Sequence, residues 1–205
     1  MRQNRRPAGP PSATLIGVTA YLTADLLDAG LDHIRQSPAD NGTLELIVCR
    51  PAVDERRVLE EGHLDLALGL VGDTWSVRDT TSTPDGSPNP DGQLTLTNAR
   101  AIALVAGLPE RWPLAGDQLY VDLDLSEAGL PAGTRLAIGH GGTVIEVTPK
   151  PHRGCAKFAA RFGPEALRFV NTGPGRVLNL RGRNARVVTP GVIRQGDAVR
   201  RASPG

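Results

Sequence analysis

Hydrophobic positions along the chain occur in short runs, some at helical spacing and others at strand spacing. Leucines and an isoleucine recur every three or four residues over 22–36 (LTADLLDAGLDHIRQ), which predicts an amphipathic helix with Thr23 as its N-cap. Composition and breaker residues predict further helices over 54–61, 99–107, 155–163 and 164–171.

Strand-like runs are as frequent as helical ones. Residues 119–125 (LYVDLDL) alternate with the two-residue period of a half-buried strand. Further strands are expected over 43–49, 94–98, 134–139 and 143–149, and on both sides of Pro190-Gly191. The segment 140–142 (HGG) indicates a hairpin between two of them. Because no regular β-α-β alternation appears, we expect a mainly β or α+β fold, such as a barrel with short peripheral helices.

Composition excludes several classes of protein. With 205 residues the chain can form one well-packed core, and no apolar run approaches the roughly 18–20 residues of a membrane helix. Aromatic residues make up only 3%, which argues against a surface that stacks single-stranded nucleic acid. The two cysteines form no disulfide framework, so we expect a cytoplasmic protein. Residues 79–93 form a long polar loop, which is a lid, an insertion or a disordered segment.

Charge is divided unevenly along the chain. Residues 151–205 hold 11 Lys/Arg against 2 Asp/Glu, a net charge of +9, whereas residues 1–150 have a net charge of −8. The division indicates either an anion-binding face on the C-terminal segment or two segments that neutralise each other within one fold. The acidic first 150 residues argue against a nucleic acid as the partner.

Cys155 is the residue best suited to carry chemistry. Pro149, Pro151 and Gly154 form an irregular approach to a stretch of helix-forming composition, so we expect Cys155 in the first turn of a helix. Unpaired N–H groups and nearby cations at such a position favour a thiolate, which attacks sulfur, holds a persulfide or ligates a soft metal. From spacing alone, a small buried cysteine is an equal alternative, and for Cys49, on a predicted strand, we expect burial.

Several motifs together resemble the MOSC domain, named for the C-terminal part of molybdenum cofactor sulfurase. The segment 145–157 (IEVTPKPHRGCAK) is similar to the region around the family's cysteine, and 181–200 to its closing hairpin. GLVGDTW at 69–75 resembles a G-x-x-G-D turn of the family, and 93–107 fits the strand and helix that follow. The segment after Asp73 departs from the pattern, since it lacks the histidine found there in small bacterial relatives.

The resemblance implies a pyruvate-kinase-like β-barrel with peripheral helices and a molybdenum-binding or sulfur-carrying role for Cys155. In relatives such as the mitochondrial amidoxime-reducing component, the metal is bound through a molybdopterin and the centre reduces N-hydroxylated compounds. Such a small-molecule reaction would need electrons from a redox partner protein, whereas a sulfur carrier would need a donor such as a cysteine desulfurase. The third alternative is a degenerate fold that binds neither.

The resemblance covers about residues 43–201 and implies a stand-alone MOSC protein without a pyridoxal-phosphate domain. We therefore divide the chain into a disordered lead-in (1–13), an N-terminal helical extension (14–42), the MOSC domain (43–201) and a tail (202–205). Neither a membrane nor a nucleic acid is expected as a partner.

The candidate ligand-binding residues each have a structural alternative. Asp73 either contacts the cofactor, orients an arginine or stabilises its turn, and Asn98 either contacts the cofactor or caps the helix after it. His152 is either a catalytic proton donor or ligand contact, or an exposed loop residue. The basic candidates for the cofactor's phosphate, with a solvated surface as the alternative, are Lys157, Arg161, Arg181, Arg183 and Arg186.

Overall fold

A computed structural model describes residues 21–78 and 83–202 of the chain. The expected lead-in (1–13), the start of the helical extension (14–20), part of the polar loop (79–82) and the end of the tail (203–205) lie outside the described residues.

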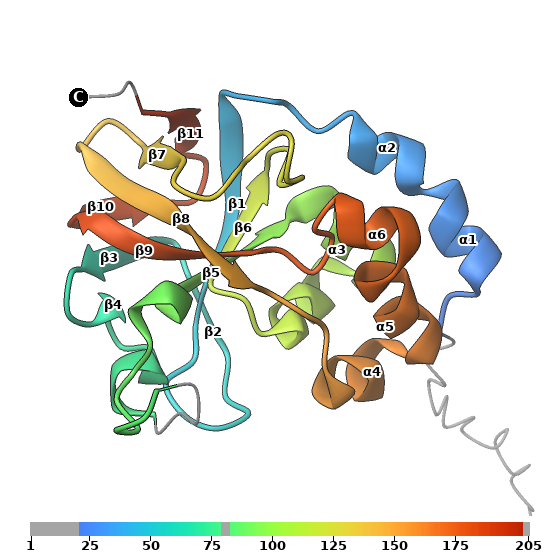
Figure 1. The fold of residues 1–205 in the computed structure, drawn as a ribbon, viewed down its shortest axis with the longest axis horizontal. Helices are drawn as coiled ribbons and strands as arrows, with labels where there is room; N and C mark the ends of the chain where they lie inside the picture. The colour runs from blue at the N-terminus through green and yellow to red at the C-terminus, as the bar shows by residue number, and fades with distance from the viewer. Residues whose placement is uncertain (1–20, 79–82, 203–205) are drawn as a thin grey trace, which may run out of the picture.

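A closed seven-stranded β-barrel forms the centre of the molecule (Figure 1). Around the ring, each strand pairs with the next and the last pairs with the first: β1 (Gly42–Cys49), β6 (Leu119–Asp122), β5 (Leu94–Asn98), β9 (Arg183–Thr189), β8 (Thr143–Pro151), β7 (Arg135–Ile138) and β11 (Ala198–Arg201). Closure leaves no free edge in the ring, which removes the unpaired backbone groups of an open sheet. The expected mainly β or α+β barrel is confirmed.

One pair in the ring, β5 with β6, is parallel, and its connection explains the helix that follows β5. Parallel neighbours need a crossover connection, and α3 (Ala99–Ala106) with the 3-10 segment η3 (Pro109–Ala115) provides it. Asn98 caps α3, because its side-chain oxygen accepts a hydrogen bond from the N–H of Ala101 at 2.9 Å.

The helix predicted over 54–61 is wrong. This segment contains β2 (Arg57–Leu59), which pairs with β1, and leads into β3 (Glu61–Asp65). In β3 exposed and buried residues alternate, but the buried position after Glu61 is Gly62, which hides the two-residue period in the sequence. Gly62 is packed so closely that an added Cβ would lie 2.9 Å from Leu70. With β10 (Gly191–Arg194) and β4 (Gly69–Leu70), β3 forms a second, three-stranded sheet.

Short helices cover one side of the barrel, at the right of Figure 1. The helix predicted over 22–36 is split at Gly30, where the chain approaches Leu104 so closely that an added Cβ would lie 2.4 Å from its side chain. Thr23 precedes the first helix as predicted, but its side chain makes no capping hydrogen bond. The remaining elements are α1 (Ala24–Ala29), α2 (Leu31–Arg35), α4 (Ala156–Phe162), α5 (Pro164–Asn171), α6 (Gly173–Val177), η1 (Thr74–Val77) and η2 (Pro90–Gly92).

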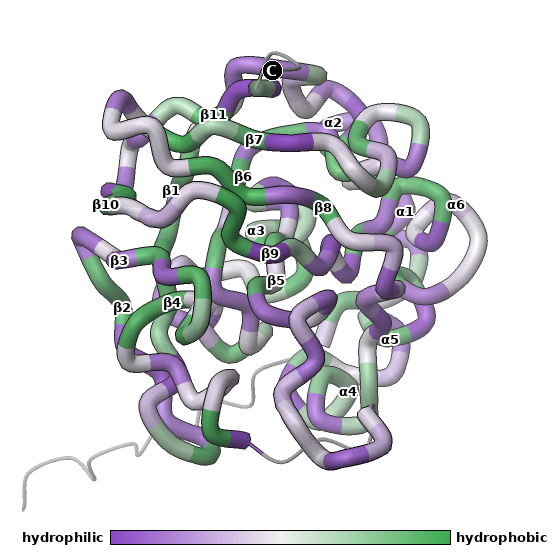
Figure 2. Tube along the Cα trace, turned by 60° about the vertical axis from the view of Figure 1, so that its left-hand side comes forward, coloured by the Kyte–Doolittle hydropathy of each residue, from purple (hydrophilic) through white to green (hydrophobic). Residues whose placement is uncertain are grey.

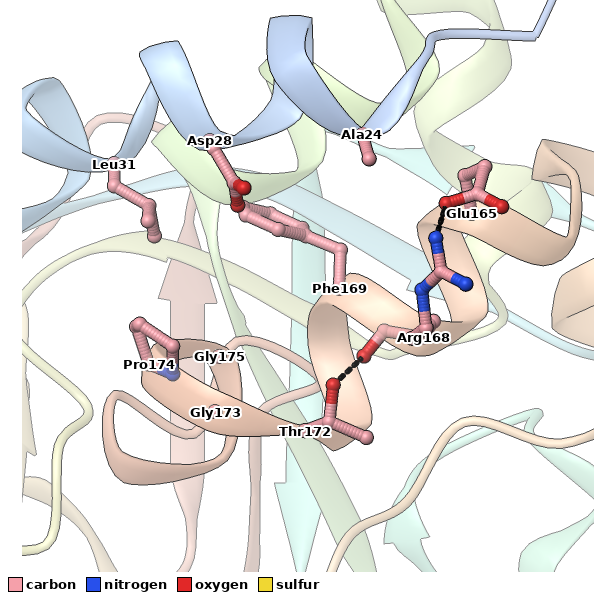
Figure 3. A pocket seen from close by; sticks show the side chains of 10 residues that line it. All are labelled: Ala24, Asp28, Leu31, Glu165, Arg168, Phe169, Thr172, Gly173, Pro174 and Gly175. Carbon is pink, nitrogen blue, oxygen red and sulfur yellow. Dashed lines mark hydrogen bonds and ion pairs between the residues drawn. The ribbon is translucent and has the colours of Figure 1, made fainter.

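Two hydrophobic clusters stabilise this arrangement. One fills the barrel, with Leu96, Leu119 and Ile145 among its fully buried members. The other joins the outside of the barrel to the helices through residues such as Tyr120 and Phe162. Figure 2 shows the hydrophobic stretches of the strands at the centre of the molecule and more hydrophilic segments in the loops below them. The helices are therefore fixed against the barrel wall, and with them the residues they carry.

Gly182, directly before β9, should not tolerate a side chain. Its φ is +109°, and an added Cβ would lie 1.9 Å from the backbone oxygen of Leu96. Gly133 has a similar φ of +86° but open space around it. Gly133→Ala should cost about 1 kcal/mol of unfolding free energy for the backbone conformation, and Gly182→Ala at least about 2 kcal/mol more because of the clash. Equal losses in urea unfolding would contradict the described packing.

Candidate active site

Cys155 lies at the start of α4, as the sequence predicts, and it is exposed, so the alternative of a small buried cysteine does not apply to it. Its backbone is extended (φ −126°, ψ 179°), and its carbonyl oxygen accepts hydrogen bonds from the N–H groups of Phe158 and Ala159 at 2.9 and 3.1 Å. Phe158 and Phe162 are buried and anchor α4 in the helical cluster. The thiol therefore projects from a fixed helix into a place that other molecules can reach.

The residue before Cys155 is held by α5. The Asn171 side chain accepts a hydrogen bond from the N–H of Gly154 at 2.9 Å and donates one to its carbonyl oxygen at 3.0 Å. An added Cβ at Gly154 would lie 2.7 Å from the end of the Leu167 side chain, so a larger residue would require that side chain to move. Sequence reasoning found Gly154 but missed Asn171, because nothing in the sequence indicates that the two meet.

A small basic cavity of about 90 Å³ lies beside this loop. Its lining residues come from the end of β8, the start of β9 and three loops: Glu127, Pro149, Lys150, Pro151, His152, Arg153, Asn179, Gly182 and Arg183. Pockets for drug-sized ligands begin at about 300 Å³, so this cavity suits a single anionic group. Arg153 is two residues from Cys155, which places their Cα atoms within about 8 Å. The sequence predicts His152 and Arg183 among these residues, but not Lys150, Arg153 or Glu127 as cofactor ligands.

A buried ion pair lies under the cavity. Asp117 is completely buried, and both its carboxylate oxygens accept hydrogen bonds from one guanidinium nitrogen of Arg181, at 2.8 and 2.6 Å. Arg181 also donates to the carbonyl oxygen of Ala115 at 2.9 Å, and its guanidinium lies 5.1 Å from the ring centre of Phe158. The predicted phosphate ligand Arg181 is thus a buried link between β6 and α4.

His152 connects the ion pair to the cavity. Its Nδ1 atom is buried and lies 3.6 Å from an Asp117 carboxylate oxygen, too long for a hydrogen bond. Burial lowers the pKa of His152 well below its ordinary value, and the positive charge of Arg181 acts in the same direction, followed by Arg50, Lys150 and Arg153. Burial raises the pKa of Asp117, whereas Arg181 opposes that rise by favouring the carboxylate. His152 is therefore a neutral, largely buried side chain rather than an exposed loop residue.

The other basic candidates lie in different surroundings. Arg183 is buried and forms an ion pair with Glu127 at the cavity. Arg161 donates to the carbonyl oxygen of Leu114 and pairs with Asp54, and Arg186 pairs with Glu146 and Asp91. Lys157 is exposed on α4, two residues beyond Cys155. The structure thus brings Arg183 and His152 together at the cavity and keeps Arg161 and Arg186 in separate ion pairs.

Asp73 and Asn98 have the structural roles that the sequence offers as alternatives to cofactor binding. The buried Asp73 carboxylate accepts hydrogen bonds from the backbone and guanidinium of Arg50 and from the N–H of Trp75. It therefore both orients an arginine and stabilises its turn. Asn98 is buried, and its side-chain amide donates to Ser37 and to the carbonyl oxygen of Leu123, in addition to its capping bond.

Over residues 21–78 and 83–202, no three His, Cys, Asp or Glu side chains come together in a way that could hold a metal ion. The helices within these ranges include none of the length and apolarity needed to cross a membrane.

The closed barrel with short peripheral helices is the architecture that the resemblance implies. The sequence model of the MOSC domain matches residues 91–200, more than half of the chain, and this chain belongs to the MOSC domain family. The match includes Cys155 and every residue that lines the cavity.

Solved structures agree with this assignment at the level of the fold. The YuaD protein of Bacillus subtilis is 18% identical, with a TM-score of 0.55 over 80% of this chain and 97% of that one. YiiM of Escherichia coli is 22% identical, with a TM-score of 0.50 over 80% of this chain and 71% of its own. No curated protein sequence gives a significant match.

The two cysteines should respond differently to substitution. Cys49 is buried at the end of β1, and burial, with the Asp73 carboxylate nearby, raises the pKa of its thiol. Cys49→Ser should cost about 1–3 kcal/mol of unfolding free energy because it buries a hydroxyl group at a position built for an apolar side chain. Cys155→Ser, at an exposed position, should change the unfolding free energy by less than about 0.5 kcal/mol. Urea unfolding of both variants checks this, and equal losses would contradict it.

Proposed function

We propose that this protein binds the molybdenum cofactor, with Cys155 as the protein's ligand to the metal and the basic cavity as the site of the pterin's phosphate. The observation that carries the proposal is the position of an exposed cysteine two residues beyond a cation-lined cavity. Family membership alone would not indicate which residues take part.

The cavity has the chemistry that a phosphate group needs. Lys150, Arg153 and Arg183 supply charged N–H donors, and Lys and Arg are the side chains that bind phosphate most strongly. Arg183 pairs with Glu127, whose side chain is 67% exposed and can therefore turn to solvent. A phosphate could then take the place of Glu127 and keep the buried guanidinium of Arg183 paired.

The remaining residues of the site orient Cys155. Asn171 holds the backbone of Gly154, and Phe158 packs against Arg181, so both sides of Cys155 are fixed before anything binds. A fixed ligand loses less conformational freedom when it binds a metal. The cofactor would supply redox chemistry at its metal, which amino-acid side chains do not provide. Reduction of N-hydroxylated compounds with electrons from a partner protein would rest on this binding.

Sulfur transfer is a second candidate function, and the exposure of Cys155 favours it. A persulfide on Cys155 would be open to a donor protein such as a cysteine desulfurase and to an acceptor. A buried thiol such as Cys49 could not exchange sulfur in this way.

The molybdenum content of the protein, purified from a host that makes the cofactor, tests the proposal. Near-stoichiometric molybdenum and pterin are expected in the wild type, with loss of the metal in Cys155→Ala. The matched control, Cys49→Ala, should retain both, because Cys49 faces the core.

The pattern of loss separates the two candidate functions. Wild-type protein without molybdenum that carries sulfane sulfur on Cys155 would favour the sulfur carrier. If neither is present, or if Cys49→Ala and Cys155→Ala lose molybdenum equally, the proposed role of Cys155 is wrong.

A further inference from the structure

We propose that His152 is a neutral hydrogen-bond acceptor within the basic cavity, positioned by the buried Asp117, and that it makes the cavity prefer a phosphate that carries a proton over a fully deprotonated anion such as sulfate. This specificity rests on the proposed function, because the phosphate of interest is that of the cofactor. Asp117 is the positioning residue and His152 the specificity-determining one.

The orientation of the His152 ring supports the first step. Nδ1 is enclosed and faces Asp117, whereas His152 as a whole lines the cavity with 14% of its side chain exposed. Because Nδ1 is the enclosed nitrogen, Nε2 is the one that a molecule in the cavity can reach. The 3.6 Å gap to Asp117 is of a kind that often shortens when a ligand binds.

Asp117 determines which nitrogen carries the hydrogen. A carboxylate only accepts hydrogen bonds, so the ring nitrogen that faces it is stabilised as N–H. Asp117 has no freedom to turn away, since it is completely buried and Arg181 binds both its oxygens. Arg181 is fixed in turn by Ala115 and Phe158.

The charges around His152 keep it neutral. Burial lowers the pKa of His152 most, followed by the positive charges of Arg181, Arg50, Lys150 and Arg153. The carboxylate of Asp117 faces its Nδ1 atom. A neutral ring with hydrogen on Nδ1 has a lone pair on Nε2. The cavity therefore combines charged donors with an acceptor that only a donor can satisfy.

This combination distinguishes anions by their protons. Sulfate at neutral pH offers only acceptor oxygens, and one of them would face the Nε2 lone pair. Hydrogen phosphate has a P–O–H group that can donate to Nε2. A phosphate monoester has such a proton only as its monoanion, which loses it with a pKa of about 6. A buried acceptor left without a donor costs about 1–3 kcal/mol, which corresponds to a preference of about fivefold to 150-fold.

Calorimetric titration of the full chain with inorganic phosphate and with sodium sulfate, at pH 7.5 and equal ionic strength, tests the inference. The wild type should bind phosphate at least about fivefold more tightly than sulfate. Asp117→Asn, whose amide can donate toward Nδ1, should reduce this ratio to about twofold or less. His140→Gln, at an exposed histidine in the turn between β7 and β8, is the matched control and should keep the wild-type ratio.

The ring nitrogens of the wild type provide a measurement that does not depend on whether Asp117→Asn folds. Nitrogen-15 NMR of the four histidines, with His152 assigned by its absence in His152→Gln, should show hydrogen on Nδ1 and none on Nε2 at pH 7.5. Hydrogen on Nε2, equal affinity for the two anions or binding of neither would overturn the inference. Molybdenum bound through Cys155 in the same protein would leave the proposed function standing.

Discussion

The ion pair between Asp117 and Arg181 is the interaction on which the site depends. Withdrawing two charges from water costs several kcal/mol per ion, and removal of one partner leaves the other uncompensated, at a cost of about 3–5 kcal/mol. Asp117 lies just before β6 in the barrel wall, whereas Arg181 lies just before β9 and stacks on Phe158 of α4. The pair thus connects the barrel to the helix that carries Cys155, and the same carboxylate faces His152.

The structure shows one of the two explanations that the sequence leaves open for the uneven charge, and we propose the other beside it. Several arginines after residue 150 pair with acids from the first 150 residues, as Arg181 does with Asp117 and Arg161 with Asp54. Lys150, Arg153 and Arg183 instead gather at the cavity, where Glu127 is the one acidic lining residue. Five of the eleven Lys and Arg residues after position 150 thus form ion pairs with acids of the first 150 residues, and the cluster of cations beside Cys155 is the anion-binding site that we propose.

Local pattern predicts much of the fold and little of the site. The strands at 43–49, 94–98 and 143–149 and the helix start at Cys155 follow from periodicity and breaker residues, and they are confirmed. The helix predicted over 54–61 is wrong because Gly62 occupies a buried strand position and hides the two-residue period of the strand. The helix predicted over 22–36 is interrupted where Gly30 packs against Leu104. Asp117 and Asn171 could not be found in this way, since each acts on a residue far away in the sequence. Asp73 stabilises a turn and Asn98 caps a helix, which are the structural roles that the sequence offers for them.

We propose that Cys155 and the cavity lined by Lys150, Arg153 and Arg183 form one site for one ligand. A crystal structure of the protein purified from a cofactor-producing host, with anomalous data collected at the molybdenum absorption edge, tests it most directly. We expect an anomalous peak at bonding distance from the Cys155 sulfur and a phosphate group among the three cations. A metal peak away from Cys155, or a pterin whose phosphate lies outside the cavity, would contradict it.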